Sequence, residues 1–182
     1  MGKKKGERGT KMHSRIFQVS KEPINEEDYI SESTFYDSAF IGEVADYVNQ
    51  DTDRNDDIAW LKDYIEGRGG IELDEAEMTI TIVDKKKFFE RSFNTFKELL
   101  DKLASTNIIQ FSGTAESGDM ENSRFAFSSL MYDLECEAEG DKFGFYIYDY
   151  GDYGYPTRLD EWVRGTKNGD KYYFGATIDY HS

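Results

Sequence analysis

Carboxylates and phenols crowd the segment YIYDYGDYGYP, which spans residues 146–156. The segment holds five tyrosines and two aspartates, and it contains no basic residue. A tyrosine ring stacks on an arginine guanidinium, while a neighbouring carboxylate accepts the paired N–H groups of that guanidinium. The composition is therefore typical of a surface that binds basic side chains of a partner.

A structural interpretation stays open beside this one for the first three tyrosines. FGFYIYDY (143–150) alternates, so it predicts a strand with aromatic residues on both faces, which is typical of a central strand. Tyr146, Tyr148 and Tyr150 would then belong to the core or to one face of the sheet. The residues in and after the turn form the candidate partner-binding surface: Asp149, Asp152, Tyr153, Tyr155, Asp160 and Glu161.

A second acidic group is DTDRNDD at residues 51–57. Its spacing has some likeness to a calcium-binding loop, but it lacks the glycine at position six, and position twelve is Lys62 instead of glutamate. We therefore assign no metal ligand here. The aspartates of this group join the candidate partner-binding surface: Asp51, Asp53, Asp56 and Asp57.

The acidic residues are numerous enough to act together. The chain has 37 Asp and Glu residues against 22 Lys and Arg, and its net charge is −15. Acids spaced roughly 6 Å apart on helices and strands present a string of anions comparable to a nucleic-acid backbone. Such a surface would suit the basic groove of a nucleic-acid-processing enzyme, although acidity also serves solubility alone.

The first residues carry the opposite charge. We expect residues 1–14 to be a flexible basic tail and residues 15–182 to be the acidic domain. The tail's candidate nucleic-acid contacts are Lys3, Lys4, Lys5 and Arg8.

Catalytic chemistry is not indicated. His13 lies in the basic tail and His181 is the penultimate residue, so neither has an expected rigid setting. Cys136 lies between Glu135 and Glu137, which disfavour its thiolate. We therefore expect a non-enzymatic protein with no catalytic residues, no metal, no cofactor and no small-molecule substrate.

The candidate residues must be positioned by the helices and strands of the fold. The sequence patterns predict a single α+β domain with a small, mostly antiparallel sheet and about four helices. Strands are expected at 15–19, 77–83, 107–111, 143–150 and 171–180. Helices are expected within 35–50, over 56–67 with Asn55 as the cap, over 85–105 with Asp84 as the cap, and over 158–165 with Thr157 as the cap. Residues 120–139 are ambiguous: their apolar spacing favours a helix, but RFAF within them alternates like a strand. The inward face of the helix at 85–105 would carry Phe89, Phe93, Phe96, Leu100 and Leu103.

The single cysteine fits a reducing compartment. No apolar run approaches the length of a membrane span, and no apolar segment follows the basic N-terminus as in a secretion signal.

Residues 14–65, SRIFQVSKEPINEEDYISESTFYDSAFIGEVADYVNQDTDRNDDIAWLKDYI, resemble type II-A anti-CRISPR proteins, which are small acidic inhibitors from phages and mobile elements of Firmicutes. A fainter likeness, in ADYVNQ and DIAWLKDYI, is to acidic antirestriction proteins that mimic DNA. Neither likeness supplies a catalytic motif.

The first resemblance implies an inhibitor in the cytoplasm of a bacterial host. It would bind a type II CRISPR RNA-guided nuclease with its guide RNA and block target DNA binding or cleavage, because that nuclease reads DNA through arginines and a basic channel. The alternatives are an antirestriction DNA mimic, an acidic adaptor protein, or an unrecognised enzyme.

Overall fold

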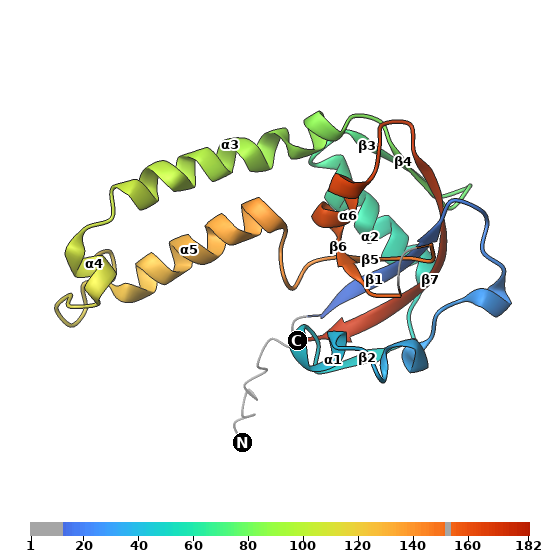
Figure 1. Cartoon of the computed structure of the whole chain (residues 1–182), viewed down its shortest axis with the longest axis horizontal. Helices are drawn as coiled ribbons and strands as arrows, with labels where there is room; N and C mark the ends of the chain where they lie inside the picture. The colour runs from blue at the N-terminus through green and yellow to red at the C-terminus, as the bar shows by residue number, and fades with distance from the viewer. Residues whose placement is uncertain (1–12, 152–153) are drawn as a thin grey trace, which may run out of the picture.

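The computed structural model describes residues 13–151 and 154–182. In this part of the chain one seven-stranded sheet has the order β3-β4-β7-β1-β5-β6, with β2 paired to β7 (Figure 1). Of the described strand pairs, only β1 with β5 is parallel. The strands are β1 (His13–Ser20), β2 (Tyr47–Asn49), β3 (Ile71–Asp74), β4 (Thr79–Ile82), β5 (Tyr146–Asp149), β6 (Thr157–Arg158) and β7 (Lys171–His181).

The predicted α+β class with a mostly antiparallel sheet is confirmed. The described residues contain more helices and strands than expected, however. The helices are α1 (Phe40–Glu43), α2 (Arg54–Glu66), α3 (Lys85–Ala104), α4 (Ile108–Ser112), α5 (Arg124–Glu139) and α6 (Leu159–Gly165), with 3-10 turns η1 (Glu26–Asp28) and η2 (Glu32–Phe35).

Strand β7 is the centre of the sheet. Along one edge it pairs with β1, in a register that runs from His13 opposite His181 to Ser20 opposite Tyr173. Its other edge is shared, because β4 pairs with its first residues and β2 with its last. A strand that is paired along both edges has its backbone groups satisfied and its side chains available to pack two layers.

Two hydrophobic cores lie on the two faces of the sheet. On the first face α2, α6 and the start of α3 pack on β1, β4, β5 and β7, and the core includes Phe17, Ile58, Ile147 and Val163. On the second face η2 and α1 pack on β1, β5 and β7. The second core is largely aromatic: it includes Phe35, Phe40, Tyr146 and Tyr180.

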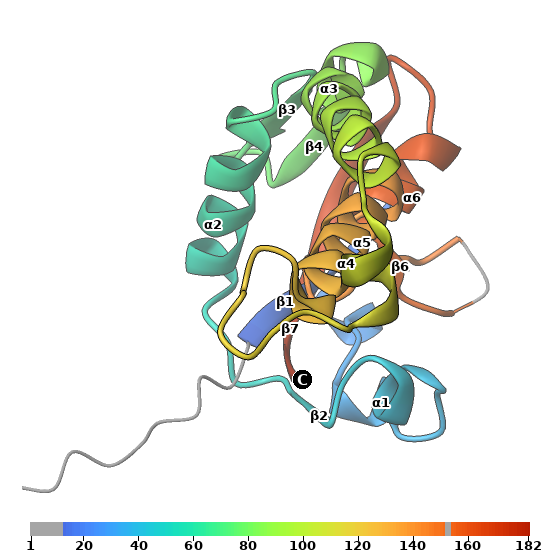
Figure 2. The ribbon, with the colours of Figure 1, turned by 90° about the vertical axis from the view of Figure 1, so that its left-hand side faces the viewer.

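Helices α3 and α5 form an antiparallel hairpin that extends away from the sheet, with the short α4 at its far end (Figures 1 and 2). We call α3, α4 and α5 together the arm. Asp84 caps α3 by accepting from the Lys87 amide at 3.1 Å, as predicted. Ser123 caps α5 by accepting from the Ala126 amide at 3.1 Å.

Two predicted elements are wrong. Residues 35–50 do not form a regular helix, because the backbone of α1 leaves helical geometry at Ile41 and Gly42 and residues 47–49 pair with the edge of β7 instead. Residues 107–111 are helical rather than extended, because Asn107 and Gln110 form a capping box at the start of α4.

Other boundaries shift by a few residues. Asp53, rather than Asn55, caps α2 by accepting from the amides of Asn55 and Asp56. Thr157 belongs to β6 instead of capping α6. Strand β1 begins at His13, inside the segment expected to be the tail, and β3 was not predicted.

No helix over residues 13–151 and 154–182 has both the length and the apolar character that crossing a membrane requires.

Gly70 is the backbone position that the junction of β3 and α3 depends on. It has φ of +78°, and an added Cβ would overlap the Asp84 carbonyl oxygen and lie 2.7 Å from the Phe88 amide nitrogen. Gly169 has a similar φ of +88°, but open space surrounds its Cβ position. We therefore expect Gly70→Ala to lower the free energy of unfolding by about 3 kcal/mol, from left-handed strain plus overpacking.

Gly169→Ala is the matched control. It carries the backbone strain alone, so we expect a loss of about 1 kcal/mol. Urea unfolding of both variants, followed by circular dichroism, measures the difference. Equal losses would contradict the steric account.

Candidate functional site

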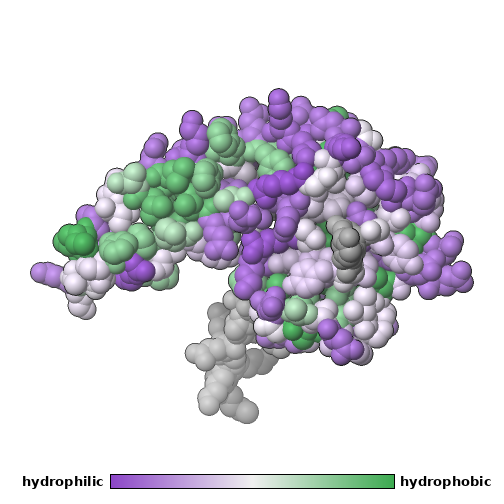
Figure 3. Space-filling model, in the orientation of Figure 1, coloured by the Kyte–Doolittle hydropathy of each residue, from purple (hydrophilic) through white to green (hydrophobic). Residues whose placement is uncertain are grey.

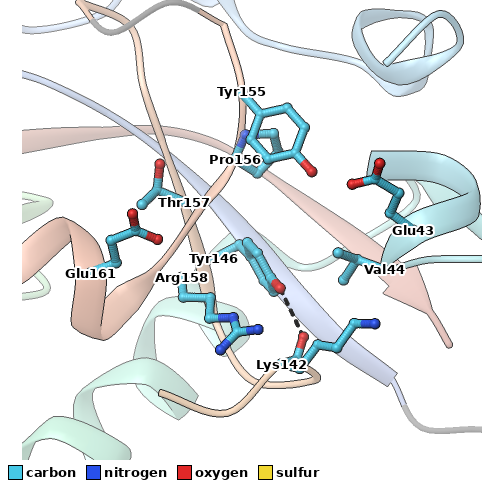
Figure 4. A pocket seen from close by; sticks show the side chains of 9 residues that line it. All are labelled: Glu43, Val44, Lys142, Tyr146, Tyr155, Pro156, Thr157, Arg158 and Glu161. Carbon is cyan, nitrogen blue, oxygen red and sulfur yellow. Dashed lines mark hydrogen bonds between the residues drawn. The ribbon is translucent and has the colours of Figure 1, made fainter. Parts of the chain in front are cut away.

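A cleft of about 540 Å³ lies between α1, β5 and β6 (Figure 4). It includes two residues of the predicted partner-binding surface, Tyr155 and Glu161, and brings them together with residues from distant parts of the chain. The cleft is lined by Glu43, Val44, Lys142, Tyr146, Tyr155, Pro156, Thr157, Arg158 and Glu161.

Tyr155 and Glu43 form the acidic side of the cleft. The phenol of Tyr155 points across the opening toward the Glu43 carboxylate (Figure 4). Burial raises the pKa of Tyr155, and the negative charge of Glu43 raises it further. Tyr155 therefore stays a neutral phenol at neutral pH, and its ring packs edge-on against Phe40 with centroids 6.4 Å apart.

The opposite side of the cleft is basic and tied to the backbone. Arg158 donates from Nη1 to the Gly140 carbonyl at 3.0 Å, and Tyr146 donates from its hydroxyl to the Lys142 carbonyl at 2.8 Å. Burial raises the pKa of Tyr146, although the nearby Arg158 opposes the shift. These bonds tie the backbone of residues 140–142 to β5 and β6.

Asp149 lies in an adjoining hollow of about 490 Å³, which shares Thr157 and Glu161 with the cleft. Its carboxylate accepts from Trp162 Nε1 at 3.2 Å and from the Gly151 amide at 3.1 Å. The structure therefore brings Asp149, Tyr155 and Glu161 together around β6. The candidate residues Asp152 and Tyr153, like Lys3, Lys4, Lys5 and Arg8, lie outside the described residues.

Two predicted surface aspartates are inside the protein, which corrects their assignment. Asp57 is 4% exposed; it accepts from Arg15 Nε at 2.5 Å and from the Thr177 hydroxyl at 2.7 Å. Asp160 is 3% exposed, and both its carboxylate oxygens accept from Arg68 Nη1 at 2.8 Å. Each is the counter-ion of a partly buried arginine, so neither is available to a partner.

The other aspartates of the group at residues 51–57 are exposed. Asp51 lies in the turn that follows β2, Asp53 caps α2, and Asp56 lies in the first turn of α2. No described residue that lines the cleft comes from this group. The two halves of the predicted surface are therefore separate patches.

The three strand tyrosines divide between core and surface. Tyr146 is buried in the second core, and Tyr148 is half-buried against that core with its ring 6.0 Å from that of Phe35. Tyr150, at the end of the strand, is exposed. The core interpretation is confirmed for Tyr146 and, in part, for Tyr148.

The arm carries an apolar surface that sequence reasoning placed inside. Phe93 is 60% exposed, and Leu100 is also exposed, although both were expected to face inward. Phe89 and Phe93 line two hollows along α3, of about 270 and 640 Å³. Figure 3 shows the hydrophobic side chains gathered over the arm. The exposed large apolar residues of the arm and its loops are Phe93, Leu100, Ile108, Ile109, Phe111, Met120, Phe125, Met131 and Tyr132.

Glu43, Lys142 and Arg158 are the cleft residues that sequence reasoning missed. They come from three segments that only the sheet pairing and the turn before β5 bring together. No local motif marks any of them. The exposure of the arm likewise had no sequence signal, because periodicity defines an apolar face without saying what covers it.

The two histidines also depart from expectation. His13 and His181 were assigned no rigid setting, but they occupy directly opposite positions of β1 and β7.

Comparisons with known proteins give no relative for this arrangement: no protein-family model, no curated protein and no solved structure matches the chain.

Asp160 is buried and the adjacent Glu161 is exposed. We therefore expect substitutions of these two acids to have different effects on stability. Asp160→Ala leaves the Arg68 charge buried without its counter-ion, so we expect the free energy of unfolding to fall by roughly 3 kcal/mol. Glu161→Ala removes an exposed charge, and we expect a change within about 1 kcal/mol. Urea unfolding of the two variants measures both values. A loss for Glu161→Ala as large as that for Asp160→Ala would contradict the assignment.

Proposed function

We propose that the chain is a non-enzymatic inhibitor that binds a nucleic-acid-processing enzyme, and that this partner is a type II CRISPR RNA-guided nuclease loaded with guide RNA. The single observation that carries the proposal is the exposed apolar surface of the arm, which occurs on a strongly acidic chain. Large exposed apolar patches are typical of protein-binding surfaces. The acidic charge favours a partner with a basic groove.

The cleft adds a specific way to hold a basic side chain. Tyr155 and Glu43 together offer an aromatic ring and a carboxylate. This is the combination that stacks on a guanidinium and accepts its N–H groups. Type II nucleases read their target through arginines and hold the guide–target duplex in a basic channel, so an arginine-binding surface suits this partner.

The resemblance of residues 14–65 to type II-A anti-CRISPR proteins narrows the partner to this nuclease class. On this proposal the protein acts in the cytoplasm of the bacterial host and blocks target DNA binding or cleavage. The basic tail residues Lys3, Lys4, Lys5 and Arg8 keep their proposed role as nucleic-acid contacts. The acidic surface also suits a restriction enzyme, so antirestriction remains the second candidate.

Salt dependence tests the electrostatic part of the proposal. We expect the purified chain to bind the guide-loaded nuclease, and its affinity to fall at least about tenfold between roughly 50 and 200 mM salt, because exposed charge pairs are screened. Binding should disappear when target DNA is already bound. Biolayer interferometry with and without target DNA measures both effects.

The same experiment can separate the effect of where the negative charges lie from the effect of the total charge of the chain. The double variant Glu43→Gln/Glu161→Gln and the control Glu72→Gln/Glu77→Gln each remove two exposed negative charges. We expect only the first to weaken binding by about tenfold or more. Failure of the wild-type chain to bind the nuclease, combined with protection of DNA from a restriction enzyme, would favour antirestriction instead.

The exposed apolar surface of the arm predicts a hydrophobic contact with the nuclease, and salt should not weaken this contact. Phe93→Ser should raise the Kd for the nuclease by roughly 30-fold, the effect expected of an aromatic residue at the centre of an interface. Tyr36 is the matched control, because it is 64% exposed but lies outside the arm, directly after η2. Tyr36→Ser should leave the Kd unchanged. Equal effects of the two substitutions would contradict a docking role for the arm.

A further inference from the structure

The two histidines of the chain meet at one end of the sheet. His13 is in β1 and His181 is in β7, and the antiparallel register places them directly opposite each other. Asp179 precedes His181 by two positions in the same strand, so its side chain projects from the same face. The imidazole rings lie edge to face, with their centroids 3.7 Å apart.

A single carboxylate oxygen joins the two rings. Asp179 Oδ2 lies 3.2 Å from His13 Nδ1 and 3.0 Å from His181 Nε2. One nitrogen or oxygen atom from each of the three residues lies within 4.8 Å of the others. In a tetrahedral zinc site with bonds of roughly 2.0–2.1 Å, ligand atoms are about 3.4 Å apart. The observed separations therefore need only small side-chain adjustments to enclose an ion.

The side chains around this cluster carry an excess of negative charge, which favours the binding of a cation. Arg15 pairs with Asp179 Oδ1 on one side and with Asp57 on the other. The two carboxylates outnumber this guanidinium, and both are buried. A buried negative charge without a full counter-charge is costly, so a cation beside Asp179 Oδ2 stabilises the group.

The surrounding residues fix the orientation of the ligands. Arg15 holds the second oxygen of Asp179, as outer-shell partners do in metal sites. The ring of Tyr47, from β2, stacks on His181 with centroids 4.0 Å apart. The side chain of His13 is 50% exposed, so the cluster is open to solvent on that side, and a water molecule can complete the coordination.

We propose that His13, Asp179 and His181 bind a divalent transition metal ion, with Zn²⁺ as the best-suited ion and water as the fourth ligand. Two imidazole nitrogens and one carboxylate favour zinc over magnesium or calcium, which prefer oxygen ligands throughout. The ion links the first and last strands of the described chain. The proposal uses none of the cleft or arm residues, so it is independent of the proposed function.

The test uses the full chain without a histidine tag, after treatment with EDTA. Isothermal titration calorimetry with zinc chloride should give one ion per chain, and zinc should raise the melting temperature in a manner that EDTA reverses. His13→Gln keeps the fold, because the side chain is half exposed, and it should weaken zinc binding by more than about 100-fold, since even outer-shell changes cost roughly 10–100-fold.

Two control variants exclude other zinc ligands. Cys136→Ser removes the only thiol of the chain, and Glu75→Gln removes an exposed carboxylate far from the cluster. Both should bind zinc as the wild type does. Bound Co²⁺ should give the visible absorption of a tetrahedral site in the wild type and the controls but not in His13→Gln.

Failure of the wild type to bind zinc at a large molar excess would overturn the proposal, and so would equal binding by His13→Gln. In either case the cluster is a hydrogen-bonded group in which Asp179 holds the two imidazoles without a metal.

Discussion

The guanidinium of Arg15 connects the elements on which the rest of the structure depends. From β1 it pairs with Asp57 at the start of α2 and with Asp179 near the end of β7. These three residues are far apart in the sequence but share one mostly buried site. A buried charge is costly unless it is paired and hydrogen-bonded, so the site is stable only when the helix and both strands are in register. The same register places His13 opposite His181.

The arm extends from the sheet because both faces of the sheet are already covered. Helices α2 and α6 pack on the first face, and the segment containing η1, η2 and α1 packs on the second. The first turn of α3 reaches the first core through Phe88, and beyond it the helix packs mainly on α5. Two helices alone cannot cover each other's apolar surface completely. The apolar residues left exposed therefore follow from the topology, and under the proposed function they form the contact surface for the partner.

The sequence was sufficient to predict the elements with strong periodicity. Helix α3 and strands β1, β4 and β7 agree with the patterns of their segments, as does the cap at Asp84. The segment of α5 had an ambiguous pattern, and the structure forms the helix rather than the strand. The patterns failed where tertiary pairing overrode local spacing: Tyr47 and Val48 have helical spacing with Phe40 and Val44, but the edge of β7 recruits them as a strand. The cleft could not be predicted because sheet pairing, rather than any local motif, assembles it. The arm is exposed because no further element of the described chain covers it. The spacing of apolar residues defines an apolar face but does not show what covers that face.

The buried aspartates, in contrast, had a signal that the acidic composition obscured. Asp57 lies one position before Ile58, four before Leu61 and eight before Ile65, so it is in phase with the buried stripe of α2. Asp160 lies three positions before Val163, so it is in phase with the buried residues of α6. An acid in phase with an apolar stripe is expected to face the core, where it needs a buried cation as its partner. Arg15 and Arg68 meet that need, so the acidic surface available to a partner consists of the residues out of phase with the cores, such as Asp56 and Glu161.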